Sequence, residues 1–149
     1  MHSTPQQTSL VEVEFATISG HARAMCNAAN MNERVHILIA NEVLMFSTAL
    51  CNLVMNKDNS MTHHQKMGLQ NPKWYETGVI HTFGEAGVVM CGKNGKLCDR
   101  GLPMVFVGCA ENPSSDCNCM WNPASCKVTE SHDIICYTAC TILCYQRCV

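Results

Sequence analysis

The sequence lacks any long uninterrupted hydrophobic run. Its most apolar stretch, residues 42–55, is broken by Ser47, Thr48 and Asn52, whereas a membrane-spanning helix needs about 20 predominantly apolar residues. Residues 1–7 contain neither a basic region nor an apolar region, so they do not resemble a secretory signal. We therefore expect an intracellular protein, in the cytoplasm or nucleus, that is not secreted and has no membrane partner.

Charged residues are also scarce. They make up 15% of the chain, against about 25% in a typical soluble domain, and the formal net charge is -2. This balance provides no overall attraction to nucleic acid, so any contact with DNA must come from a local basic patch. The length of 149 residues fits one ordinary domain or two very small ones.

Cysteine, in contrast, is abundant, with 12 residues of which only Cys26 and Cys51 precede residue 91. A disulfide scaffold would need an export route, so free thiols or metal ligands are the expected states. One set of four thiols has the number that a structural zinc site uses: Cys109, Cys117, Cys119 and Cys126. Because no pair has the C-x₂-C spacing of such sites, we expect no metal site here and keep a zinc-binding or disulfide-bonded protein as an alternative.

The first part of the chain has helical periodicity. Apolar residues at steps of three and four, from Phe15 through Ile18 and Ala22 to Ala29, predict an amphipathic helix over roughly 11–30. A second helix is predicted over roughly 40–56. Residues 58–78 are weakly periodic and contain proline and glycine, so we expect a linker with at most one helical turn.

After Ile80 the pattern changes to short apolar runs separated by turn residues. Runs at 87–90, 103–108 and 117–121 predict three strands, and residues 127–135 suggest a fourth. Asn94-Gly95 and residues 122–125 are typical of turns. The predicted fold is therefore α+β, with helices in 1–57, a linker in 58–78, a small antiparallel β-barrel or sandwich in 79–136 and a cysteine-rich tail in 137–149.

Several short motifs occur in a fixed order along the chain. Thr4-Pro5-Gln6-Gln7 is followed by Glu12, and later come Phe83-Gly84-Glu85, Gly95-Lys96-Leu97, Asp99-Arg100-Gly101, Phe106-Val107-Gly108, Met120-Trp121-Asn122-Pro123 and Ser131-His132-Asp133-Ile134-Ile135. Over roughly residues 2–136 this order resembles the integrase part of a copia-type retrotransposon Pol polyprotein. The resemblance implies the last helices of an RNase H-like catalytic core followed by an SH3-like module.

The resemblance also implies a function and its limits. Glu12 matches the last of three catalytic carboxylates of the family, and the other two, both aspartates, have no counterpart in this chain. Strand transfer by such enzymes uses two Mg²⁺ or Mn²⁺ ions held by the three carboxylates, which one carboxylate cannot do. We therefore expect a truncated and drifted integrase fragment that is catalytically inactive alone and has no cofactor of its own.

Some departures from the family pattern suggest drift. Cys109, Cys119 and Cys136 stand where relatives carry larger residues, and a single base change converts several codons to cysteine. Loss of a buried aromatic side chain costs about 3–5 kcal/mol, a large part of the stability of a domain. Because we also expect the helices to have lost the sheet that they would cover, the sequence predicts a marginally stable chain.

The remaining functional candidate is contact with DNA. Four basic residues are expected on loops of the β-unit, where they could contact phosphates: Lys93, Lys96, Arg100 and Lys127. Acidic residues such as Glu85 and Glu130 occur in the same region, so binding should be weak and non-specific. A small non-catalytic module that binds nucleic acid or a protein partner therefore stays open as an alternative, and the sequence does not decide whether the chain self-associates.

Overall fold

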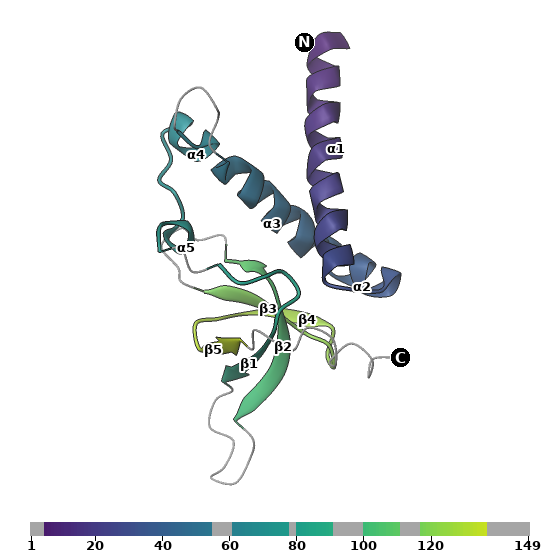
Figure 1. The fold of residues 1–149 in the computed structure, drawn as a ribbon, viewed down its shortest axis with the longest axis vertical. Helices are drawn as coiled ribbons and strands as arrows, with labels where there is room; N and C mark the ends of the chain where they lie inside the picture. The colour runs from purple at the N-terminus through teal and green to yellow at the C-terminus, as the bar shows by residue number, and fades with distance from the viewer. Residues whose placement is uncertain (1–4, 55–60, 78–79, 91–99, 111–116, 137–149) are drawn as a thin grey trace.

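A computed structural model of the protein describes residues 5–54, 61–77, 80–90, 100–110 and 117–136, shown as coloured ribbon in Figure 1. Helices precede strands along this part of the chain, which confirms the predicted α+β class. The elements are α1 (Pro5–Ala28), α2 (Glu33–Leu38), α3 (Ala40–Leu53), α4 (His63–Lys66), α5 (Lys73–Glu76), β1 (Ala86–Met90), β2 (Gly101–Cys109), β3 (Asn118–Asn122), β4 (Lys127–Ser131) and β5 (Ile134–Cys136). None of the described helices is both long and apolar enough to cross a membrane.

The two long helices, α1 and α3, confirm the two helices predicted from periodicity. α1 begins at Pro5, several residues before the predicted start, because proline is tolerated in the first turn of a helix. A short helix, α2, lies between them and was not predicted. The side chain of Asn32 caps it by accepting a hydrogen bond from the Val35 N–H at 2.9 Å.

The segment expected to hold at most one helical turn contains two, α4 and α5, so that expectation was wrong. The signal for α4 is a capping box. The Thr62 hydroxyl accepts from the Gln65 N–H at 3.2 Å, and the Gln65 Oε1 accepts from the Thr62 N–H at 3.0 Å. Pro72 directly precedes α5, where its fixed φ suits a helix start.

All strand pairs are antiparallel, in the order β4-β3-β2-β1-β5. The first four strands form a meander, and β5 returns to pair with β1. The predicted fourth strand is therefore two strands, which lie at opposite edges of the sheet. Because β4 and β5 do not pair, the described sheet is open and does not close into a barrel. The Asn94-Gly95 turn lies outside the described residues.

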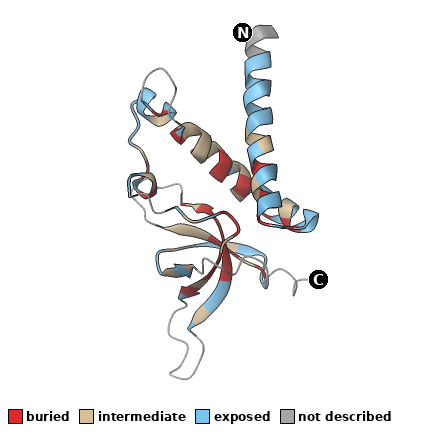
Figure 2. Cartoon of the chain, in the orientation of Figure 1, coloured by how far each residue is buried: buried red, intermediate tan, exposed pale blue. Residues whose placement is uncertain are grey.

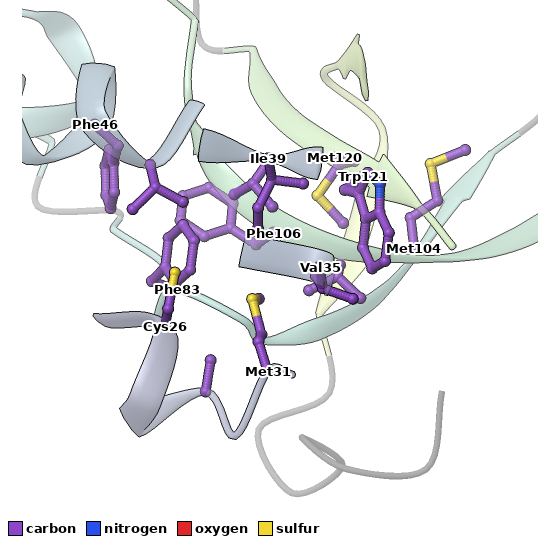
Figure 3. Packing of buried hydrophobic residues seen from close by; sticks show 14 of the residues in the cluster. Cys26, Met31, Val35, Ile39, Phe46, Phe83, Met104, Phe106, Met120 and Trp121 are labelled. Atoms are coloured by element: carbon purple, nitrogen blue, oxygen red, sulfur yellow. The ribbon is translucent and has the colours of Figure 1, made fainter. Parts of the chain in front are cut away.

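The helices and the sheet share one hydrophobic core (Figure 3). Phe46 of α3 contacts three aromatic rings, with ring centroids 6.2 Å from Phe83, 6.4 Å from Trp74 and 5.7 Å from Phe106 of β2. Residues 104–107 of β2 are all buried, so both faces of this strand are covered. The helices therefore pack against the C-terminal sheet, a contact that the sequence did not predict.

Helix α1 is buried over only part of its length (Figure 2). Ala22 and Cys26, in the C-terminal half of the helix, belong to the shared core, as does Ala29 directly after its end. A buried Ser47 of α3 donates to the Ile18 carbonyl at 3.0 Å and fixes the two helices together. Further toward the N-terminus, Phe15 is 65% exposed although it continues the same apolar stripe. The predicted apolar stripe therefore does lie on a helix, but the rest of the protein covers this stripe only from Ile18 onward.

Candidate functional site

Glu12, the residue that matches a catalytic carboxylate of the resembled family, is exposed in the N-terminal half of α1. Within the described residues it belongs to no group of three side chains that could hold a metal ion. Magnesium and manganese at a strand-transfer site need several converging oxygen ligands. A single exposed carboxylate does not fit such a pair of ions.

Two of the four predicted DNA-binding residues, Lys93 and Lys96, lie outside the described residues. Arg100 and Lys127 are both exposed. Arg100 directly precedes β2, while Lys127 begins β4 and pairs with Asn122 of β3. The register places Lys127 about 13 Å further along the strand direction than Arg100, at 3.3 Å per residue. The two cations therefore lie toward the same end of the sheet without forming one patch.

The four cysteines considered as zinc ligands do not converge. Cys126 lies in the turn between β3 and β4, whereas Cys109 and Cys117 lie near the opposite end of β3. The five residues of β3 separate these ends by roughly 17 Å. Burial, with a smaller contribution from Cys119, also raises the pKa of Cys109 to about 12. The structure thus does not assemble this zinc site.

A different set of ligand side chains does come together. His81, Glu85 and Cys136 each place one donor atom within 4.8 Å of the others. The His81 Nδ1 lies 3.6 Å from the Glu85 Oε2. His81 and Glu85 come from the segment that leads into β1, and Cys136 comes from β5, directly opposite Gly87 of β1. The pairing of β1 with β5 is therefore what creates this group.

Local hydrogen bonds fix the segment that carries two of these side chains. The Glu85 Oε2 accepts from the Thr82 N–H at 3.0 Å, and the Glu85 N–H donates to the Thr82 carbonyl at 2.9 Å. The Phe106 N–H of β2 donates to the Glu85 carbonyl at 2.8 Å. The His81 ring meets the Phe106 ring edge to face, with centroids 5.5 Å apart. Glu85 and His81 are thus held against the sheet.

The environment of the group is partly dry. The His81 and Glu85 side chains are only 23% and 13% exposed. Burial, together with the nearby Glu85 carboxylate, raises the pKa of Cys136 to about 11. When both are ionised, the Glu85 carboxylate and the Cys136 thiolate are two negative charges close together and largely shielded from water, so they repel each other. A bound cation would remove that repulsion.

Sequence reasoning missed this group for an identifiable reason. His81 and Glu85 have a His-x₃-Glu spacing, which was a usable signal, but Cys136 was interpreted as a drifted core residue. Its proximity depends on β5, which the sequence merged with β4 into one strand. In the sequence, 50 residues lie between Glu85 and Cys136, and the β1–β5 pairing brings the two together.

A cavity of about 220 Å³ lies among α1, α2 and α3. Its lining is largely apolar and includes Ala22, Cys26 and Val43. The Nε2 of His36, which also lines it, is buried and has no hydrogen-bond partner among the described residues. Burial raises the pKa of Cys26, so this thiol is a poor nucleophile. The cavity therefore offers space but no set of reactive groups.

Comparisons of the chain with models of protein families, with curated proteins and with solved structures find no match. The resemblance to copia-type integrases therefore depends on the motif residues of the sequence alone.

Proposed function

We propose that the chain is a non-catalytic module of the copia-type integrase kind, which binds DNA weakly and non-specifically. The observation that carries the proposal is the position of the motif residues in the core. Phe83, Phe106 and Trp121 come from three separate motifs, and all three are buried in the same hydrophobic cluster (Figure 3). Motif pieces that meet in one core support a shared fold more strongly than their order in the sequence does.

Two other motif residues, Gly84 and Asn122, have a conformation or a hydrogen bond that the local backbone needs. Gly84 has φ +83°, and a Cβ added there would lie 2.3 Å from the Ala29 Cβ. Asn122 ends β3, and its Oδ1 accepts from the Ala124 N–H at 2.9 Å in the turn that follows. The motifs thus supply the helix–sheet junction and a hairpin turn, as expected of residues that preserve a fold.

The non-catalytic part of the proposal follows from the carboxylates. In the resembled family three acids share two metal ions, and only Glu12 has a counterpart here. Its exposed position on α1, without a converging acidic group in the described part of the chain, supports a role at the surface of a helix. Because α1 begins at Pro5, Glu12 lies beyond its first turn, where the helix dipole no longer favours an acidic residue.

The DNA-binding part of the proposal rests on exposed cations of the sheet. Arg100 and Lys127 are exposed and lie at the starts of β2 and β4, where a duplex backbone can reach them. Each phosphate contact contributes to a binding constant that falls with salt. The net charge of -2 and the exposed Glu130 on β4 oppose this attraction, so affinity should be low and independent of sequence.

Fluorescence anisotropy with labelled duplexes of unrelated sequence, measured at several salt concentrations, tests this function. We expect binding at low salt that weakens as salt increases, with similar constants for each duplex. The double variant Arg100→Ala/Lys127→Ala should bind more weakly and lose about 1.8 from the slope of log K against log salt, at about 0.9 per contact.

The matched control is Arg34→Ala/Lys66→Ala, which removes the same charge from exposed positions on α2 and α4. It should keep the slope of the unmodified protein. Absence of binding at low salt, or an equal loss of slope in both double variants, would refute DNA contact through the sheet.

A further inference from the structure

The group formed by His81, Glu85 and Cys136 has the composition of a metal site. Its donors are an imidazole nitrogen, a carboxylate oxygen and a sulfur, all within 4.8 Å of one another. Zinc accepts all three donor types, whereas magnesium and calcium prefer oxygen alone. The donor set therefore selects for zinc among the common divalent ions of proteins.

The distances are close to those that zinc requires. Zinc binds nitrogen and oxygen at about 2.0–2.2 Å and sulfur at about 2.3 Å, so tetrahedral ligands lie roughly 3.3–3.7 Å apart. The His81 Nδ1 and the Glu85 Oε2 are already 3.6 Å apart. Because no pair in the group exceeds 4.8 Å, side-chain movements of about 1 Å would complete the geometry.

The surroundings restrict each ligand in the way that bound metals need. The Thr82 N–H orients the Glu85 carboxylate, and the Phe106 ring supports the His81 imidazole. Opposite Cys136, the strand position in β1 is Gly87, where an added Cβ would lie 3.2 Å from the Cys136 Sγ. The absence of a side chain at Gly87 leaves room for the sulfur over the sheet.

We propose that His81, Glu85 and Cys136 bind one Zn²⁺ ion, with the fourth tetrahedral position taken by water or an external ligand. Binding releases the Cys136 thiol proton to solvent and leaves the oxidation states unchanged. The ion joins the segment before β1 to the edge strand β5, so it also stabilises the sheet. This site is independent of DNA binding and shares no residue with the four cysteines considered from the sequence.

Cobalt substitution provides the test, because tetrahedral Co²⁺ bound to a thiolate has intense visible and near-ultraviolet absorption. The full-length, reduced protein should bind Co²⁺ with these bands, and Zn²⁺ should displace it. Cys136→Ser should lose the thiolate band and one equivalent of metal. His81→Gln should weaken binding more than about 100-fold, beyond the effect of losing an outer hydrogen-bond partner.

Cys126→Ser is the matched control, since Cys126 is exposed in the β3–β4 turn, away from the group. It should keep the bands, the stoichiometry and the rise in melting temperature that Zn²⁺ produces. If Cys136→Ser fails to fold, His81→Gln and Glu85→Gln decide the question by the same absorption. Equal metal binding by the unmodified protein and by these ligand variants would overturn the proposal, as would an unmodified protein without the bands.

Discussion

Gly84 is the residue at which backbone and packing constraints coincide. Its φ of +83° is unfavourable for other residues, and an added Cβ would clash with Ala29. Gly68 has a similar φ of +74° but nothing within 4 Å of an added Cβ. We expect Gly84→Ala to lower the free energy of unfolding by about 1–3 kcal/mol more than Gly68→Ala does. Urea unfolding of both variants measures this difference. Equal losses of stability would show that Ala29 can move aside without a measurable loss of free energy.

Cys109 should make stability depend on alkaline pH. Its pKa is about 12 in the folded protein and 9.0 for an ordinary thiol, so the unfolded chain loses this proton first as pH rises. The stabilisation is therefore complete below pH 9 and is lost progressively as pH rises toward 12, at up to about 1.4 kcal/mol per pH unit. Urea titrations from pH 7 to 10.5 should show this decline.

Cys109→Ala tests whether that decline comes from this thiol. The variant should unfold with a shallower dependence on pH above 9, because one of the contributing groups is gone. Cys126→Ala, at an exposed position, should keep the steeper dependence. Parallel curves for the unmodified protein and Cys109→Ala would contradict the assignment.

Single residues also show what sequence could and could not establish about the site. Glu12 could be matched to a family position, and its isolation could be expected from the missing aspartates. The His81, Glu85 and Cys136 group could not be predicted, because strand pairing rather than local pattern brings Cys136 to the other two. Patterns within about ten residues predict local structure, whereas a site across two strands needs the register.

Among the elements, α1 and α3 differ in how far the fold covers them. Phe46 of α3 is 6% exposed and contacts three aromatic rings, whereas Phe15 of α1 is 65% exposed. Phe46→Ala should therefore cost about 3–5 kcal/mol, and Phe15→Ala should change stability by no more than about 0.5 kcal/mol. Chemical denaturation of both variants checks the contrast. A large loss from Phe15→Ala would mean that the N-terminal half of α1 is covered.

Long helices and strands could be predicted from the sequence, whereas very short ones could not. α1 and α3 span several turns, so their apolar stripes are visible, and β2 is a continuous apolar run. α2 has six residues and β5 has three, too few for a periodic pattern. Their structure depends on contacts with the rest of the chain, such as Val35 in the core and the pairing of Ile134 with Val89.

At the scale of the whole molecule, the helices and the sheet should unfold together. The shared core removes one reason for expecting marginal stability, since the helices and the sheet bury the same cluster of side chains. Far-ultraviolet circular dichroism and the fluorescence of the buried Trp74 and Trp121 should therefore report the same transition. Two separated transitions would show that the helices and the sheet are independent units.

We propose that the chain binds DNA without catalysis, and that Glu12, which has no partner aspartates of the resembled family in this chain, has no catalytic role. An end-joining assay tests it most directly, with the full-length protein, duplex DNA ends and Mg²⁺ or Mn²⁺. We expect the DNA to be bound at low salt and no joined product to form at any metal concentration. Joined DNA ends that disappear with Glu12→Gln would contradict the claim, because they would require a catalytic role for that carboxylate.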